Sequence, residues 1–440
     1  MLKLSVATNI PDLLGFLSKL RDLSLKPQME AWQPDTLNLD AMQQLVQDLG
    51  QPQQRYPSLH VAGSNGKGST SALLAAALGA QGYRVGLYTS PHLSGQLAGI
   101  RLDGAPVPLS ELEQSWQSLY PQAAWLPQLT LFEVVTALAF QHFARVGVDA
   151  AVIEVGLGGR LDATNVLSPA VSVIMPIDLE HTRVLGDSLA AIAAEKAGII
   201  KPGIQVVMAA QPTEAAAVMR KTAIEQDAPL TEVGQDVLYE RLAWDRRGQH
   251  VRIWASERPD EAVDLRLGLL GAHQAANAAA AYAALKAFPL PVSGEAISAG
   301  FAAARWPGRL QLIEGQPPTL LDAAHTPAAA RALAAALDDH FPDQRWLALV
   351  GVSADKHLDG LLAPLKGRLQ AAWATQSSHS RAMPAAELAQ RLRAAGLEAR
   401  AAPRLAEALK AGRELAATEQ LGLLVFGSVF LAEEVLNILD

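Results

Sequence analysis

The chain has 440 residues, of which half are apolar and 18% are charged, with a net charge of −8 and no cysteine. This length exceeds one compact core, so we expect about two or three domains, and the apolar content argues against disorder. The acidic balance argues against a nucleic-acid partner, which would need a basic patch. Disulfides, thiolate metal sites and cysteine nucleophiles are excluded.

Neither end of the chain has the pattern of an export or membrane signal. Pro11 and Asp12 interrupt the region where a signal peptide needs an apolar run. The apolar stretch from Leu421 to Ala432 is about a dozen residues long, too short to span a bilayer. We therefore expect a cytoplasmic protein.

The first informative motif runs from His60 to Thr70. An apolar, β-branched approach leads into three glycines, a lysine and hydroxyl side chains, and Ser71 to Leu78 has the pattern of a helix start. This is the layout of a phosphate-binding loop, in which backbone N–H groups and a helix N-terminus hold oxyanions. Gly68 separates Lys67 from the hydroxyl that usually follows the lysine. The motif predicts a nucleoside triphosphate ligand; the alternative is a glycine-rich turn that binds nothing.

The rest of the chain alternates short apolar runs with alanine-rich helical patterns, which indicates an α/β protein with mainly parallel sheets. The predicted strands are 84–88, 150–155, 170–175, 205–208, 319–321, 346–350 and 423–426. Between Leu238 and Leu267 the alternation of polar and apolar residues predicts antiparallel strands within the first domain. The proline-bearing stretch 288–294 is the expected domain boundary.

Three polar residues near strand or helix ends are candidates for chemistry. Glu154 ends an apolar strand and faces the edge where α/β proteins bind ligands, the position of a metal-binding acid; the alternative is a solvated strand end. His181 follows the next strand beside acids and suits a metal or phosphate, although a single histidine is more often structural. Lys196 lies near the end of a predicted short helix that Gly198 terminates. Its local sequence alone predicts a lysine at the surface.

Taken together, these motifs resemble the folylpolyglutamate synthase/dihydrofolate synthase branch of the Mur ligases. The similarity runs almost from end to end, and Gly68 after Lys67 is the family's own form of the loop. The matching segments are Gly63–Ser69, Thr89–Leu93, Leu131–Glu133, Glu154–Asn165, Glu195–Ile199, Gly271–Ala278, Pro307–Arg309 and Asp322–His325.

The resemblance implies a fold and a reaction. The fold would be α/β, with a P-loop-containing Mur-ligase central-type domain over residues 1–293 and a smaller, Rossmann-like glutamate ligase domain over residues 294–440. ATP would phosphorylate a substrate carboxylate, and the amine of L-glutamate would attack the acyl phosphate. The expected substrates are dihydropteroate or a reduced folate, with no membrane partner and a monomeric state.

The resemblance also implies roles for individual residues. Catalysis is assigned to Lys67, His181 and Lys196, and two Mg²⁺ ions to Ser90, Glu154, His181 and Lys196, with Lys196 carbamylated so that it becomes an anionic oxygen ligand. ATP is assigned to Ser64, Asn65, Gly66, Lys67, Gly68, Ser69, Asn277, Arg309, Asp322 and His325. The pterin is assigned to Thr130, Phe132, Glu133, Leu161, Asp162 and Ala163. An aromatic side chain such as Phe132 stacks on a flat heterocycle, although in an apolar helix it more often belongs to the core.

The chain departs from the family pattern on the acceptor side. Ala98 and Gly99 stand where the family usually has a Glu-Arg pair, and Ala41 stands where arginine is common. Thr326 replaces an asparagine and Glu180 replaces an aspartate. Each missing arginine weakens recognition of an anionic substrate by about 1.5–3 kcal/mol if it made a charged hydrogen bond. A ligase with a non-folate acceptor is therefore the first alternative, and an ATP-driven switch or motor is the alternative from another class.

Overall fold

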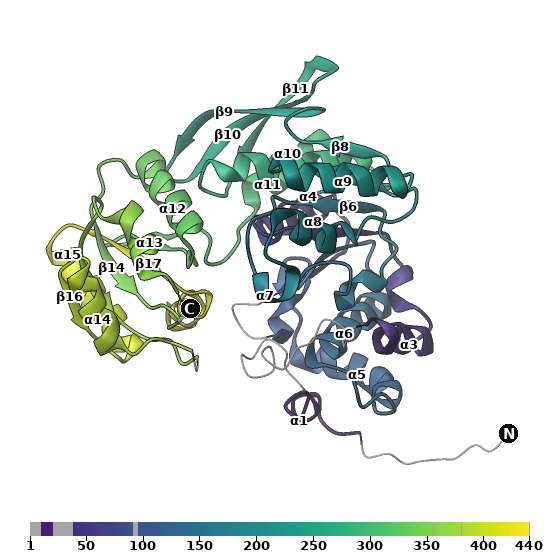
Figure 1. Ribbon diagram of the computed structural model, residues 1–440, viewed down its shortest axis with the longest axis horizontal. Helices are drawn as coiled ribbons and strands as arrows, with labels where there is room; N and C mark the ends of the chain where they lie inside the picture. The colour runs from purple at the N-terminus through teal and green to yellow at the C-terminus, as the bar shows by residue number, and fades with distance from the viewer. Residues whose placement is uncertain (1–9, 21–37, 91–95, 355, 380, 440) are drawn as a thin grey trace. The chain divides into compact units, whose positions relative to one another are not determined.

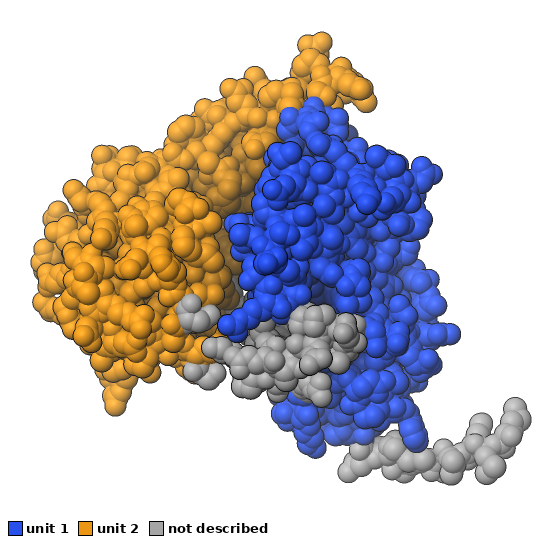
Figure 2. Space-filling model, in the orientation of Figure 1, with its two compact units in different colours: residues 1–236, 280–297 blue, residues 237–279, 298–440 orange. Residues whose placement is uncertain are grey.

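The computed structural model describes residues 10–20, 38–90, 96–354, 356–379 and 381–439. The chain divides into two compact units, coloured separately in Figure 2. The first comprises residues 1–236 and 280–297, and the second comprises residues 237–279 and 298–440. Helices α10 (His273–Ala287) and α11 (Gly294–Ala303) each cross this division.

The first unit, coloured mainly purple to teal in Figure 1, is built on an eight-stranded sheet. Its strand order is β4-β3-β2-β5-β1-β6-β7-β8. Neighbouring strands pair in parallel along β2, β5, β1, β6, β7 and β8, whereas the β2–β3 and β3–β4 pairs at one edge are antiparallel. The bounds are β1 Ser58–Ala62, β2 Val85–Tyr88, β3 Ile100–Leu102, β4 Ala105–Pro106, β5 Ala150–Glu154, β6 Val171–Ile174, β7 Gln205–Met208 and β8 Leu230–Glu232. The central strands are buried along their whole length, which explains their continuous apolar sequences.

Helices cover both faces of this sheet. The bounds are α1 Leu13–Leu17, α3 Asp40–Asp48, α4 Lys67–Ala80, α5 Leu109–Ala123, α6 Leu131–Val146, α7 Thr182–Leu185, α8 Leu189–Ala197 and α9 Thr213–Glu225. One core joins α3, α5 and α6 to β5, and another joins α8 and α9 to β6 and β7. The β1–α4–β2 connection runs along the sheet in the opposite direction to β6–α8–β7. Right-handed crossovers therefore place α4 on the other face.

The second unit contains a six-stranded sheet with the order β12-β13-β17-β14-β15-β16. Its strands are β12 Gln311–Ile313, β13 Thr319–Leu321, β14 Trp346–Val350, β15 Leu369–Ala374, β16 Ala399–Ala401 and β17 Gly422–Phe426. One core packs α12 (Pro327–His340), α13 (Leu358–Leu362) and α14 (Ala385–Ala394) on this sheet. A second core packs α15 (Leu405–Thr418) and α16 (Val429–Leu439) against alternate residues of the same strands. The predicted α/β fold with mainly parallel sheets is confirmed.

A separate antiparallel sheet also belongs to the second unit. It consists of β9 (Val237–Asp245), β10 (Gly248–Ala255) and β11 (Arg258–Leu267). The sequence predicts these strands within the first domain, and the division into compact units groups them with residues 298–440. A polar network joins them to α12: Arg241 pairs with Asp339 and donates to Gln249 Oε1 over 2.7 Å. His340 receives the Gly271 N–H over 2.9 Å.

Among the described residues, no helix is long and apolar enough to cross a membrane.

The Arg241 network generates a stability prediction. Arg241→Met should lower the free energy of unfolding by about 2 kcal/mol, because Asp339 loses a charged hydrogen bond in a half-buried place. The matched control is Arg252→Met on the same sheet, whose pair with Asp264 is about half exposed on both sides. That change should leave the free energy of unfolding almost unchanged, because solvent screens the pair. Urea unfolding followed by circular dichroism measures both, and equal losses would contradict the assignment.

Candidate functional site

Four neighbouring parallel strands of the first unit place the predicted residues at one edge of the sheet. The phosphate loop follows β1, Glu154 ends β5, Ser90 follows β2, and Glu180 and His181 follow β6. These strands are adjacent in the order β2-β5-β1-β6. Ligands of open α/β sheets bind at the carboxyl ends of the strands, where connections leave in opposite directions.

The phosphate loop is held from behind by the segment after β6. Ser64 N–H and Asn65 N–H both donate to Pro176 O, over 2.9 and 3.2 Å, and Ser64 Oγ donates to Asp178 O over 3.1 Å. Gly63 has φ 140°, and a Cβ there would lie 2.6 Å from the Met175 Cβ. This position therefore needs glycine.

Helix α4 begins at Lys67, four residues before the predicted start at Ser71. The prediction placed the start too late because glycine and serine are weak helix formers, and the loop geometry overrides that preference. Gly66 is the N-cap in the left-handed conformation, so the N-terminal N–H groups of α4 begin directly at the loop. Gly68 is half-buried, while Ser69 is buried within the first turn of the helix.

Two lysines converge behind this loop on a single acceptor. Lys67 Nζ donates to Gly63 O over 2.7 Å, and Lys196 Nζ of α8 donates to the same oxygen over 3.0 Å. Lys196 is 2% exposed, so it is not the surface lysine that its local sequence indicates. Its second partner is Glu180, whose Oε1 lies 2.8 Å from Nζ.

The charges in this cluster shift one another's pKa values. Burial, followed by the positive charge of Lys67, lowers the pKa of Lys196 to about 8, although Glu180 acts in the opposite direction. Burial alone would raise the pKa of Glu180, but Lys67 and Lys196 together outweigh it and hold that pKa below its usual value. The cluster is therefore a concentrated positive charge with one compensating carboxylate.

The predicted metal ligands are placed at the same edge. Ser90 Oγ is buried and has no hydrogen-bond partner among the described residues, and Glu154 is 5% exposed. His181 is exposed and has φ 47°, at the N-cap of α7. In the part of the chain that the structure describes, no three His, Cys, Asp or Glu residues form a group that could hold a metal. A cation here would therefore need hydroxyl, modified-lysine or water ligands. Pro91, His92 and Leu93 of the matching motif lie outside the described residues.

Asp162 organises the glycine-rich loop that follows β5. Its Oδ2 accepts the N–H groups of Gly156 and Leu157, over 3.0 and 2.9 Å. Its Oδ1 accepts Thr164 N–H over 3.0 Å and Thr164 Oγ1–H over 2.5 Å. Burial raises the pKa of Asp162, and these hydrogen bonds act against that rise. Ala163, buried, starts the short helix η4 (Ala163–Val166), and Leu161 is half-buried.

Thr130 and Glu133 form a reciprocal capping box at the start of α6. Glu133 Oε2 accepts Thr130 N–H over 2.8 Å and its hydroxyl over 2.7 Å. Phe132, between them, is half-buried and stacks on Tyr88 with ring centroids 6.3 Å apart. A Cβ on Gly156 would lie 2.6 Å from Phe132 Cζ, so the aromatic ring and the glycine-rich loop share one wall.

The remaining predicted nucleotide residues belong to the second unit. Asp322, directly after β13, accepts the N–H groups of Leu310 and Ala324, over 2.9 and 2.8 Å. Burial raises the pKa of Asp322, while the positive charge of Arg309 opposes it. His325 Nδ1 lies 2.9 Å from Ala323 O. Asn277, 4% exposed, donates to Gln274 Oε1 over 2.9 Å.

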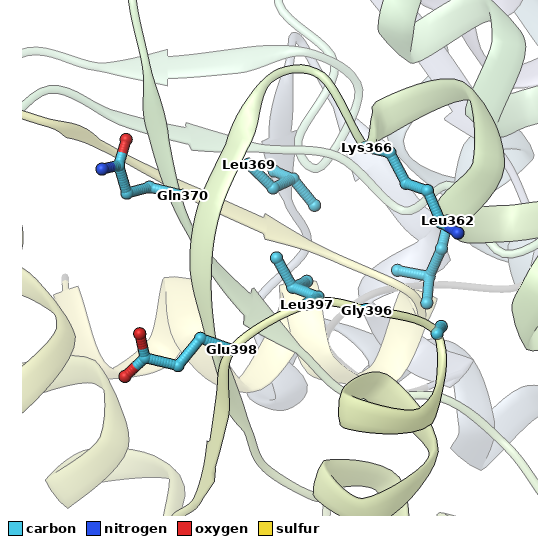
Figure 3. A pocket seen from close by; sticks show the side chains of 8 residues that line it. Leu362, Lys366, Leu369, Gln370, Gly396, Leu397 and Glu398 are labelled. Carbon is cyan, nitrogen blue, oxygen red and sulfur yellow. The ribbon is translucent and has the colours of Figure 1, made fainter.

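A pocket in the second unit lies away from these residues. Figure 3 shows Leu369 and Leu397 between the polar side chains of Gln370 and Glu398 and those of Leu362 and Lys366. The pocket is near 140 Å³ and sits where β15 and β16 begin. Asp322 lies at the opposite, carboxyl edge of this sheet, so the pocket holds none of the predicted site residues.

Sequence reasoning missed three residues of the site. His60 and Thr164 form a buried hydrogen bond of 2.8 Å, and Tyr88 backs Phe132. The available signal was a histidine inside the apolar strand 58–62, which a fully buried strand accepts only when the ring has a partner.

The loop geometry generates a binding prediction. Gly63→Ala should weaken ATP binding at least about tenfold, because the new Cβ displaces the loop from Met175. The matched control is Gly79→Ala in α4, where nothing lies within 4 Å of the new Cβ. That change should leave ATP binding unchanged and stabilise the helix by about 0.5–1 kcal/mol. Isothermal titration calorimetry with a non-hydrolysable ATP analogue measures both; unchanged binding by Gly63→Ala would refute the role.

Family models match most of the chain. Residues 61–285 match the Mur ligase middle domain, and residues 308–429 match the glutamate ligase domain of Mur ligases. The dihydrofolate synthase/folylpolyglutamate synthase of Mycobacterium tuberculosis is 35% identical over 375 residues, covering 80% of this chain and 77% of that protein. The Bacillus subtilis protein of the same name is 36% identical, and the match covers 74% of this chain and 78% of that protein.

Solved structures of similar fold belong to proteins with related names. Escherichia coli FolC, determined with DHPP and ADP, superposes with a TM-score of 0.84 at 30% identity, covering 99% of this chain and 98% of that one. Mycobacterium tuberculosis folylpolyglutamate synthase, complexed with ADP and AMPPCP, superposes with a TM-score of 0.83 at 33% identity. The match covers 94% of this chain and 97% of that one. The chain therefore belongs to the dihydrofolate synthase/folylpolyglutamate synthase family of the Mur ligases, which are ATP-dependent ligases.

Proposed function

We propose that this enzyme joins the amine of L-glutamate to a folate-type carboxylate through an acyl phosphate formed from ATP. The observation that carries the proposal is the pair of buried or half-buried lysines that share Gly63 O behind the phosphate loop. The names of the relatives, and the DHPP and ADP in the Escherichia coli structure, support the substrate classes. The acceptor is dihydropteroate, a reduced folate, or both.

The reaction requires two anions to meet, because a carboxylate attacks the γ-phosphate of ATP. Without cations between them, Coulomb repulsion at about 4 Å costs several kcal/mol in a partly buried site. The loop N–H groups, the N-terminus of α4 and Lys67 hold the phosphates and offset that repulsion. Lys67 is already aligned by Gly63 O, so little reorganisation is needed when ATP binds.

The residues at the sheet edge fit Mg²⁺. The buried hydroxyl of Ser90, unpartnered among the residues that the structure describes, and the buried carboxylate of Glu154 are hard oxygen ligands at the ends of neighbouring strands. When bound, the ion neutralises phosphate charge and polarises the transferring phosphoryl group. We propose that Ser90, Glu154, His181 and Lys196 hold two Mg²⁺ ions, with His181 and Lys196 at the second ion and Ser90 supplying the hydroxyl that Gly68 removes from the position after Lys67.

We propose that Lys196 is carbamylated. An ammonium beside Lys67 would repel a metal ion, whereas a carbamate would attract it. The lowered pKa supports the reaction with CO₂, because about half of the Lys196 amines are neutral at pH 8, the form that attacks CO₂. Carbamylation would also break the present ion pair with Glu180, since both groups would then be anionic.

The acceptor side is supported by the wall around Asp162. The half-buried Phe132, which stacks on Tyr88, offers a flat apolar surface. Glu133 uses its Oε2 in the capping box at the start of α6, and its Oε1 belongs to the same carboxylate. We propose that Thr130, Phe132, Glu133, Leu161, Asp162 and Ala163 contact the pterin. Asp162 is saturated by four donors from its own loop, so binding through its carboxylate requires one of those bonds to be exchanged.

On the nucleotide side, we propose that Asn277, Arg309, Asp322 and His325 bind ATP together with the loop residues Ser64 to Ser69. We retain the domain boundary at 293/294, a monomeric state and a cytoplasmic location as predictions. The competing function is a ligase with a non-folate acceptor, favoured by the absence of the usual arginines at Ala41 and at Ala98–Gly99.

The proposed function predicts a specific substrate requirement. ADP release should stay low with ATP alone and rise at least about tenfold only when L-glutamate and an acceptor are both present, because the acyl phosphate needs its nucleophile. The assay compares dihydropteroate, tetrahydrofolate and tetrahydrofolate diglutamate in parallel. ADP release that ignores glutamate and acceptor would indicate an ATPase switch, and failure of all three acceptors would favour a non-folate substrate.

The carbamate generates a second prediction. Lys196→Ala should abolish ligation, and a small carboxylate such as acetate should restore part of it by occupying the emptied space. The control is Lys196→Arg, which keeps the positive charge and fills that space, and should be inactive with or without acetate. Undiminished ligation by Lys196→Ala would refute the carbamate. A ¹³C-carbonate label bound to the wild-type protein and lost in Lys196→Arg tests the modification without an activity measurement.

A further inference from the structure

A buried chain of hydrogen bonds joins the strand of the phosphate loop to the loop on the acceptor side. His60 of β1 lies three residues before Gly63 and is fully buried. Its Nε2 lies 2.8 Å from Thr164 Oγ1, and Thr164 Oγ1 lies 2.5 Å from Asp162 Oδ1. His60 Nδ1 is buried and has no hydrogen-bond partner among the described residues.

The direction of each bond follows from the number of protons available. The Asp162 carboxylate accepts four hydrogen bonds, two on each oxygen, so none of its lone-pair positions is left for a proton of its own. The single hydroxyl proton of Thr164 must therefore point to Asp162. Thr164 Oγ1 can then only accept from His60, which requires the imidazole proton to be on Nε2.

The surroundings keep His60 neutral. A proton on Nδ1 as well would create a buried charge and a donor without an acceptor. Burial, and then the positive charge of Lys201, lowers the pKa of His60 to about 3. Lys201 itself is held by Asn165 O over 3.1 Å, one residue after Thr164.

We propose that His60 is a positioning residue for acceptor binding. As a neutral, Nε2-protonated imidazole, it holds Thr164 so that the hydroxyl aligns Asp162 toward the N–H groups of Gly156 and Leu157. Gly156 lies on the wall shared with Phe132. The inference rests on the proposed folate site for its consequence, although the tautomer itself is independent of the substrate.

The first test is the tautomer in the wild-type protein. Long-range ¹H–¹⁵N correlation spectra of ¹⁵N-histidine-labelled enzyme at pH 7 should show a protonated Nε2 and an unprotonated Nδ1 for His60, assigned by its loss in His60→Gln. A protonated Nδ1, or an imidazolium, would overturn the inference.

The second test separates positioning from stability. His60→Leu removes the donor and should raise the KM for the folate-type acceptor about tenfold, while the KM for ATP changes by less than about twofold. His60→Gln carries an amide N–H close to the position of Nε2 and should restore the acceptor KM to within about threefold of wild type. Thr164→Val should resemble His60→Leu, and the double variant should be no worse than either single one.

The matched control is His142→Leu. His142 is equally buried, and its Nδ1 lies 3.2 Å from Ser115 Oγ, between α5 and α6. This variant should lose stability but keep both KM values. An acceptor KM unchanged in His60→Leu, or raised equally in His142→Leu, would overturn the inference. If the wild-type enzyme glutamylates no folate-type acceptor, the proposed function fails, and the tautomer measurement still decides the hydrogen-bond direction.

Discussion

The carbonyl oxygen of Gly63 is the point on which the site depends, because it accepts the ammonium groups of both Lys67 and Lys196. Two cations on one oxygen repel each other, and the site tolerates them because Glu180 pairs with Lys196 over 2.8 Å. The arrangement places two ammonium groups beside the N-terminus of α4, where the phosphates of ATP are expected. It also explains why Gly63 is a glycine, since any side chain would push its carbonyl away from this position.

The last turn of α8 links the two halves of the first unit's site. Lys196 contacts the phosphate loop, while its neighbour Glu195 contacts the glycine-rich loop that follows β5. Arg160 N–H donates to Glu195 O over 2.7 Å, and Asn165 Nδ2 donates to Gly198 O over 3.0 Å. A Cβ on Gly159 would lie 2.7 Å from Glu195 O, so the loop packs directly on the helix. A change at Lys196, such as carbamylation, would therefore affect both the phosphate loop and the glycine-rich loop after β5.

Much of the fold was predictable because the central strands are continuous apolar runs, and the loop from Gly63 to Thr70 has a distinctive pattern. The structure corrected what local sequence does not encode. Lys196 has the sequence of a surface lysine, yet the fold buries it. The antiparallel strands 237–267 were expected, but their attachment depends on Arg241 meeting Asp339 almost a hundred residues later. The buried partner of His60 comes from a different loop and has no local signal.

The four departures from the family pattern fall into two physical groups. Thr326 and Glu180 both make side-chain contacts: the Thr326 side chain caps α12 by accepting Ala329 N–H over 3.2 Å, and the Glu180 carboxylate pairs with Lys196 over 2.8 Å. Ala41 and Ala98–Gly99 do not replace what an arginine would supply. Ala41 is a buried residue of α3 that packs into the core, and the carbonyl of Gly99 receives Thr89 N–H over 3.2 Å. The positive charge that the family pattern would supply is absent at these positions, so we expect them to affect selectivity among acceptors rather than the use of ATP.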